Sequence, residues 1–83
     1  MYLHLGDDKV ILGDSLIAIL NLGDPVSSDL IEIIENAQLE KKLFNISLKD
    51  KNKSLVVCND KLYLSPISSN TLFKRAIYFR REV

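Results

Sequence analysis

The chain has little of what most catalytic sites and disulfide scaffolds are built from, with one histidine, one cysteine, three glycines and no tryptophan. A lone cysteine cannot form an internal disulfide, and His4 with Cys58 cannot assemble a paired-histidine or Cys-x-x-Cys metal site. Gly6, Gly13 and Gly23 are scattered, without the spacing that cradles a phosphate. We therefore expect no enzyme, no metal and no cofactor. Cys58 stands in an apolar stretch, which predicts a buried, inert thiol in a reducing compartment.

The chain also lacks a long apolar run. Its longest candidate, residues 16–22, is far shorter than the roughly 20 residues that a membrane crossing needs. Asp7 and Asp8 stand where a signal peptide would carry positive charge. We therefore expect a cytoplasmic protein with no membrane partner. A length of 83 residues predicts one small domain, 1–83, whose stability is shared with a partner copy.

The formal net charge of zero conceals a separation of the two signs along the chain. Residues 1–40 hold one basic and eight acidic residues, whereas residues 41–83 hold ten basic and three acidic ones. Such a separation can present a basic face to a polyanion. It can equally let the acidic half of one copy meet the basic half of the next.

Hydrophobic periodicity predicts an α+β fold, a single small domain with a mostly antiparallel sheet of about six short strands and two helices. Asn59-Asp60 tolerates the left-handed backbone of a tight hairpin, and Pro66 closes the strand that follows. The near-continuous Leu and Ile of residues 16–22 predict the central strand, buried on both faces. The expected strands are Tyr2–Leu5, Lys9–Leu12, Leu16–Leu22, Phe44–Leu48, Ser54–Cys58 and Lys61–Ser65.

Serines are expected to cap both helices. Ser27 or Ser28 would open the first helix, which ends in Lys41 and Lys42, and Ser68 and Ser69 would open the second near Asn70. The first helix is expected to face the sheet with a stripe of Leu30, Ile33, Ile34 and Ala37. The second is expected to use Leu72, Ala76, Phe79 and Val83, with Phe73 and Ile77 beside them.

Two basic features are candidate binding surfaces. The polar loop of residues 49–53, expected at a hairpin tip, carries Lys49, Lys51 and Lys53 at alternate positions, where three ammonium groups could meet successive phosphates. Lysines at such a loop can equally serve solubility and discourage edge pairing. The second feature is a helix face that could track a nucleic acid or pack on an acidic neighbour. That face carries Lys74, Arg75, Tyr78 and Arg81.

Four stretches together resemble a known family. They are MYLHLG, DSLIAIL, SSDLIEIIENA and SLVVCNDKLYLSPISSNTLFKR, and they span residues 1 to about 76. In order and spacing they are similar to the small bacterial extracellular matrix regulatory proteins, most closely the B-type relatives. The resemblance implies a DNA-binding regulator of biofilm-matrix genes that self-associates, into rings in the A-type relatives.

In those relatives, arginines just before the third strand and in the loop are implied to contact DNA. This chain has Ser15 at the first position, and Asp50 followed by Lys51 in the loop. Lys51 is thus the best carry-over, with Lys49 and Lys53 as neighbours. Lysine keeps a point charge for phosphate but not the planar fork of arginine for guanine, so binding should be directed to the backbone.

Two functions follow as competing expectations. The first is a non-enzymatic, self-assembling DNA-binding transcriptional regulator, with double-stranded DNA and further copies of itself, possibly a ring, as partners. Its expected DNA-binding residues are Lys49, Lys51, Lys53, Lys74 and Arg75. The alternative is a charge-complementary homo-oligomeric assembly or adaptor protein with a protein partner and no direct DNA binding.

Overall fold

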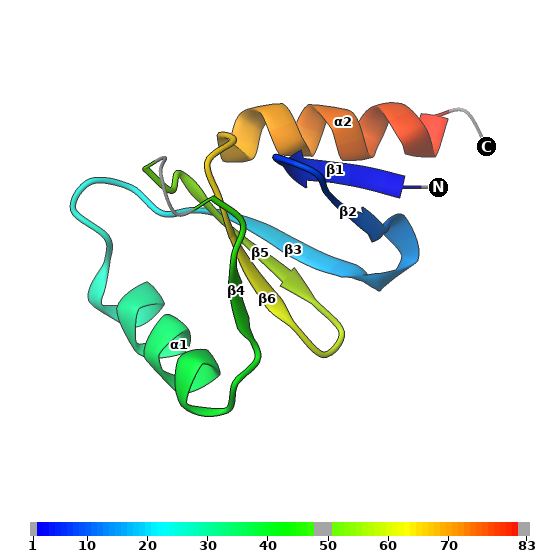
Figure 1. Cartoon of the computed structure of the whole chain (residues 1–83). Helices are drawn as coiled ribbons and strands as arrows, with labels where there is room; N and C mark the ends of the chain where they lie inside the picture. Colours follow the sequence, from blue (N-terminus) through cyan, green and yellow to red (C-terminus); the bar gives the residue numbers. More distant parts are fainter. Residues whose placement is uncertain (1, 48–50, 82–83) are drawn as a thin grey trace.

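The computed structural model describes residues 2–47 and 51–81, and side chains up to residue 77. It confirms the expected α+β fold, with six strands and two helices in the described residues. Figure 1 shows their arrangement. In chain order the elements are β1 (Tyr2–Gly6), β2 (Lys9–Leu12), a 3-10 turn (Gly13–Ser15), β3 (Leu16–Asn21), α1 (Ser28–Leu39), β4 (Leu43–Asn45), β5 (Ser54–Cys58), β6 (Leu62–Ser65) and α2 (Ser69–Arg81).

The strands form two sheets. β1 and β2 make an antiparallel pair, and the other four strands are ordered β3-β5-β6-β4, with β4 parallel to β6 and the remaining pairs antiparallel. The prediction that β3 is central was wrong, since β5 and β6 hold the centre and β3 lies at an edge. Its expected burial on both faces was wrong too. Ile17 is 62% exposed, and it lies where the register of β3 on β5 shifts between Leu16 and Ala18.

The segment after β4 was expected at a hairpin tip, and this was also wrong. Because β4 runs parallel to β6, the chain must cross the end of β6 to reach β5. The amide of Ile46 donates to the carbonyl of Leu64 (3.0 Å), and that of Lys53 to the carbonyl of Ser65 (2.8 Å). The segment is therefore fastened at both ends to β6. Lys49 lies outside the described residues.

In the β5–β6 hairpin, β5 has the predicted bounds and β6 begins one residue later than predicted, at Leu62. The chain reverses at Asn59-Asp60, where the amide of Cys58 donates to the carbonyl of Lys61 (2.8 Å). Neither turn residue adopts the expected left-handed backbone. That conformation occurs instead at the β1–β2 turn, where Gly6 has φ 120°. A Cβ at Gly6 would stand 3.2 Å from the Pro66 ring, so glycine permits both the turn and this close approach.

The core lies between the two sheets and beneath α2. The hairpin supplies Leu3, Leu5 and Ile11, and α2 supplies Leu72, which is fully buried. From β5 and β6 come Val56, Cys58 and Tyr63. The buried hydroxyl of Ser65 donates to the carbonyl of Leu5, so a hydrogen bond also joins the sheets.

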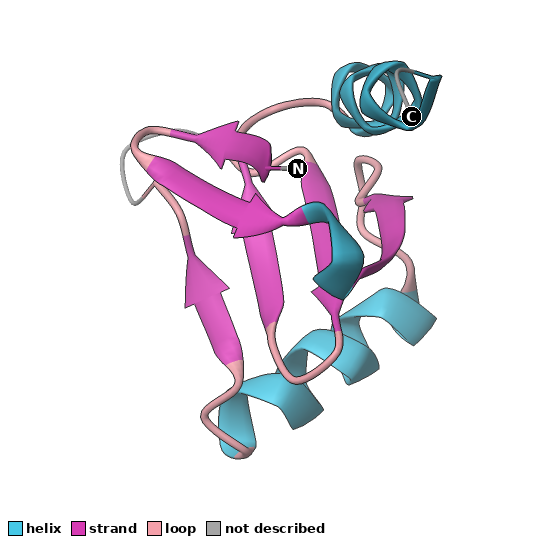
Figure 2. Ribbon diagram, turned by 90° about the vertical axis from the view of Figure 1, so that its right-hand side faces the viewer, coloured by secondary structure: helices cyan, strands magenta, loops and turns pink. Residues whose placement is uncertain are grey.

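α1 begins as predicted but ends early. The hydroxyl of Ser27 accepts from the amide of Leu30 (3.3 Å), and the helix stops at Leu39 because Lys41 adopts a left-handed conformation (φ 59°). The stripe expected against the sheet holds only in part, since Ala37 is buried but Ile33 is exposed. The helix lies beside β4, at the opposite end of the molecule from α2 (Figures 1 and 2).

β4 and α2 also depart from the expected burial. The alternation in this segment predicts Phe44, Ile46 and Leu48 on the buried face. Ile46 packs against the core as expected, but Phe44 is exposed and Ser47 is buried, and Leu48 lies outside the described residues. In α2, Leu72 is buried in the core as expected and Ala76 is half-buried, but Phe73 and Ile77 are exposed. The side chains of Phe79 and Val83 lie outside the description. Within the described residues, neither helix is long and apolar enough to cross a membrane.

Candidate nucleic-acid interface

Lys51 and Lys53 project from the segment that crosses the end of β6. Both side chains are exposed, whereas Asn52 between them is half-buried and donates from Nδ2 to Oδ1 of Asn45 (3.2 Å). The backbone of Lys53 is fixed on both sides, because its amide bonds Ser65 and its carbonyl accepts from the amide of Leu22 (3.1 Å). The alternation expected for the loop therefore holds over residues 51–53, with both lysines exposed and the backbone of Lys53 fixed.

These two lysines line an open hollow of about 330 Å³ together with the start of α2. Ser68 opens α2, and its hydroxyl accepts from the amide of Thr71 (3.3 Å) as an N-cap. The amino-terminal end of a helix carries a partial positive charge. The hollow thus combines two lysines with a positive helix end, a setting that favours an anion such as phosphate. The hollow is lined by Asn21, Gly23, Asp24, Lys51, Asn52, Lys53 and Ser68.

The carboxylate of Asp24 already forms an ion pair with the ammonium group of Lys51. Its Oδ2 lies 3.1 Å from Nζ of Lys51, with both side chains about four-fifths exposed, at 80% and 77%. An ion pair this exposed is worth only about 0 to 1 kcal/mol, so a phosphate can compete for Lys51. Asp24 was missed from the sequence, where Gly23-Asp24-Pro25 suggested only a chain break. The pairing of Asn21 with Ser54 explains the contact, because the same antiparallel register, continued outward, sets Asp24 opposite Lys51, but the sequence alone does not give that register.

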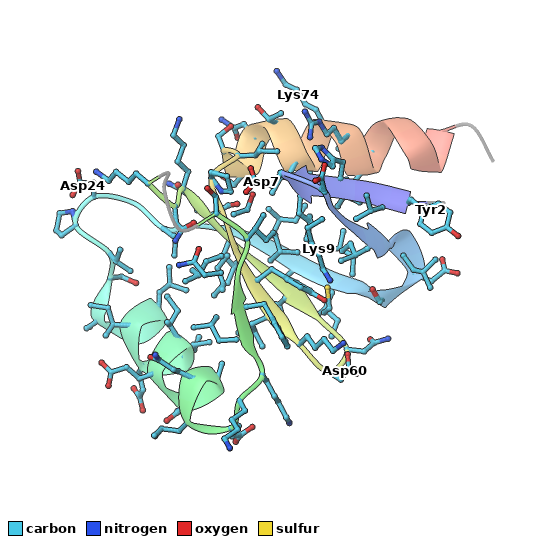
Figure 3. All side chains as sticks on the ribbon, in the orientation of Figure 1. Tyr2, Asp7, Lys9, Asp24, Asp60 and Lys74 are labelled. Carbon is cyan, nitrogen blue, oxygen red and sulfur yellow. The ribbon has the colours of Figure 1, made fainter. Side chains whose placement is uncertain are left out.

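The two α2 residues expected to bind DNA, Lys74 and Arg75, do not join this hollow. Lys74 is exposed and points away from the sheet on the outer side of α2, while Asp24 lies on the loop before α1 (Figure 3). Arg75 turns toward the hairpin, where its Nη1 donates to the carbonyl of His4 (3.2 Å). Of the four expected DNA-binding residues that the structure describes, it therefore brings Lys51 and Lys53 together and places Lys74 and Arg75 on other surfaces.

Ser15 and Cys58 lie at the other end of β3. The hydroxyl of Ser15 donates to the carbonyl of Leu12 (2.7 Å) and closes the turn before β3. Cys58 is buried as predicted, and desolvation raises the pKa of its thiol, which disfavours the nucleophilic thiolate. His4 is exposed, and its Nε2 donates to the carbonyl of Asp7. Among the described residues, no group of three or more His, Cys, Asp or Glu side chains could hold a metal ion.

Comparison with known proteins identifies the family of this chain. A family model described as RemA-like, extracellular matrix regulatory protein A-like, matches residues 2–76. The chain belongs to the RemA-like family. This confirms the resemblance drawn from the sequence.

Two relatives illustrate the family. The chain is 36% identical over 76 residues to extracellular matrix regulatory protein B of Bacillus subtilis strain 168, with 92% of this chain and 90% of that one covered. It is 32% identical over 74 residues to a candidate regulatory protein of Thermotoga maritima, with 88% of this chain and 77% of that one covered. Both names describe regulation, not catalysis.

Proposed function

We propose that this RemA-like chain is a non-enzymatic transcriptional regulator that binds the phosphate backbone of double-stranded DNA through Lys51 and Lys53. The observation that carries the proposal is the hollow beside the start of α2, which Lys51 and Lys53 line and where the backbone of Lys53 is hydrogen-bonded on both sides. The regulatory part draws support from the family and from relatives named as regulatory proteins. Genes of the extracellular matrix are the proposed targets.

Affinity is proposed to come from repetition. A single hollow offers two lysines, too few contacts for tight binding at physiological salt, because each phosphate contact contributes only one released counterion. Copies joined in one assembly engage a duplex at many points, and each further contact benefits from a high effective concentration. The proposed regulator therefore acts as an oligomer.

Recognition through lysine should be directed to phosphates more than to base edges. An ammonium group is a point charge, whereas bidentate recognition of guanine uses the planar fork of arginine. The arginine nearest the hollow in sequence, Arg75, donates to a backbone carbonyl of β1 instead. We therefore expect the affinity of this chain to vary little among duplexes of different sequence.

The test is DNA binding over a range of salt with matched lysine substitutions. Lys51→Gln and Lys53→Gln should each weaken binding of a fluorescent duplex and lower the slope of log K against log salt by about 1 for each copy that contacts the duplex. Lys61→Gln is the control, because Lys61 follows the turn at the other end of the β5–β6 hairpin. Circular dichroism verifies that each variant keeps its fold.

Two results would contradict the proposal. One is a protein that does not bind duplex DNA even at low ionic strength. The other is a Lys61→Gln variant that loses as much affinity as Lys51→Gln. High-mass species that dissociate in salt, together with no DNA binding, would favour the alternative of an assembly protein with a protein partner.

A further inference from the structure

Two aromatic side chains lie next to each other on one face of the four-stranded sheet. Phe44 of β4 and Tyr63 of β6 are paired in the parallel register, and residues paired in this way on neighbouring strands point to the same face. Their ring centroids are 5.7 Å apart and the rings are tilted by 32°. Tyr63 belongs to the buried core, whereas Phe44 is 43% exposed at the edge of the sheet. Of this pair, Phe44 therefore offers ring surface to solvent.

A lysine ammonium group lies over each of these rings. Nζ of Lys61 is 5.7 Å from the centroid of Phe44. Nζ of Lys9, which reaches from β2 toward β6, is 5.2 Å from the centroid of Tyr63 (Figure 3). Both lysine side chains are exposed. We call Phe44, Lys9 and Lys61 the aromatic platform.

An exposed aromatic ring flanked by cations matches the chemistry of an unpaired nucleotide. A nucleobase is planar and stacks on an aromatic face, while its phosphates are attracted to ammonium groups. Bases within a duplex are already stacked on their neighbours and cannot offer their faces. We propose that the aromatic platform binds single-stranded DNA, with one unpaired base stacked on Phe44 and the adjoining phosphates near Lys9 and Lys61.

Lys61 must leave the ring of Phe44 when a base arrives. An exposed cation–π contact contributes about twofold to fivefold to an equilibrium, whereas stacking of a base on an aromatic side chain contributes about fivefold to 150-fold to affinity. Stacking is therefore the stronger contact, and the base displaces Lys61 from the ring. The flexible four-carbon stem of Lys61 lets its ammonium group turn toward a phosphate.

The charge around the platform is nearly balanced. Asp8 precedes Lys9 and Asp60 precedes Lys61 in the chain, and both acidic side chains are exposed. Asp60 lies at the tip of the β5–β6 hairpin (Figure 3). The attraction for phosphate is therefore weak here, and stacking should supply most of the affinity. Single-strand binding should depend only shallowly on salt, because the salt slope reports released counterions.

The platform is separate from the hollow proposed for duplex DNA. Lys53 bonds Ser65 at one end of β6, and Lys61 precedes the other end, about 13 Å away along the strand. None of the platform residues lines the hollow. The inference therefore goes beyond the duplex site and does not depend on it. Where both sites operate, one copy can hold a duplex and an unpaired strand together, as at a locally melted site.

The first test places a reporter on the platform. The chain has no tryptophan, so Phe44→Trp introduces a single indole fluorophore. An oligothymidylate of about 12 nucleotides should quench its emission, because a stacked base contacts the indole directly, and a duplex of the same length should not. Phe73→Trp is the matched control, since Phe73 is an exposed phenylalanine of α2, at 56%. Equal quenching of the two variants, or no quenching of Phe44→Trp, would overturn the inference.

The second test removes the ring and keeps an apolar side chain. Phe44→Leu should weaken binding of a labelled oligothymidylate by about tenfold and leave duplex binding unchanged. Lys61→Gln should weaken oligothymidylate binding by about twofold to fivefold. Both side chains are exposed, so both variants should keep the fold, which circular dichroism checks. Competition by poly-glutamate as strong as by unlabelled oligothymidylate would contradict the proposal, because poly-glutamate carries charge without bases.

These outcomes separate the platform from the duplex site. In a chain that carries both Lys51→Gln and Lys53→Gln, duplex binding should fall while the oligothymidylate still binds. If that double variant loses the oligothymidylate as well, or if Phe44→Leu leaves its binding unchanged, the platform falls. The duplex site stands in either case, provided that Lys51→Gln weakens duplex binding.

Discussion

The ion pair between Asp24 and Lys51 predicts that removing the charge of Asp24 strengthens DNA binding. Oδ2 of Asp24 lies 3.1 Å from Nζ of Lys51, within the hollow proposed for a phosphate. A phosphate that binds Lys51 must displace this carboxylate or tolerate it nearby. Asp24→Asn keeps the size of the side chain and removes its charge.

The size of the expected gain in affinity follows from the solvent exposure of the two side chains. Because both side chains are about four-fifths exposed, the lost pair is worth at most about 1 kcal/mol. A change of about 1.4 kcal/mol is a factor of ten, so relief of the competition alone should tighten DNA binding by up to about fivefold. The gain should be larger at about 50 mM salt than at about 200 mM, because salt screens exposed charges.

Fluorescence anisotropy of a labelled duplex measures this gain in affinity. Two further variants test whether the gain comes from the pair of Asp24 with Lys51. Glu40→Gln, which breaks a comparably exposed pair with Lys42, should leave DNA affinity unchanged. In a Lys51→Gln background, Asp24→Asn should gain less than in the wild type, because the two residues are coupled. Weaker binding by Asp24→Asn, or an equal gain in both backgrounds, would refute the reasoning.

Three predictions concern stability. Leu72→Ala should lower the free energy of unfolding by about 2 to 5 kcal/mol in urea titrations, since Leu72 is fully buried, and an effect below about 1 kcal/mol would contradict this core. Ser65→Ala should cost about 1 to 3 kcal/mol in the same assay, because it leaves the carbonyl of Leu5 without its buried donor; an unchanged midpoint would argue against that bond. Burial raises the pKa of the Cys58 thiol and of the Tyr63 hydroxyl above their ordinary values. The folded chain then binds more protons than the unfolded one, so the urea midpoint should fall as the pH rises through the ordinary pKa values of cysteine and tyrosine, about 8.5 and 10, and a flat profile there would refute it.

Local sequence patterns predicted which segments form strands and helices better than they predicted which elements lie side by side in the fold. The hairpin of β5 and β6 follows from two short apolar runs and a two-residue turn, all within 12 residues of one another. The edge position of β3 does not, because it depends on where the β1–β2 hairpin packs. A run of Leu and Ile is compatible both with a central strand and with an edge strand that leaves some of these side chains exposed. Ile17 is an example of the second case.

The candidate DNA site was also predictable only in part from the sequence. The alternation of Lys51, Asn52 and Lys53 was visible in the sequence, and the two lysines are exposed as expected. The separation of Lys74 and Arg75 from them was not visible, since it depends on the angle at which α2 crosses the sheets. Early termination of α1 was likewise hidden, because the left-handed backbone of Lys41 is unusual for a lysine.

The attachment of the crossing segment to β6 has a consequence for how such a domain can vary. Ile46 and Lys53 bond to the consecutive residues Leu64 and Ser65, so the start and finish of the excursion are neighbours on one strand. Each doubling in length of a loop closed in this way costs only about 0.6 kcal/mol. Extra cationic residues can therefore be inserted between those two anchors, or their order changed, while the sheet beneath stays as it is.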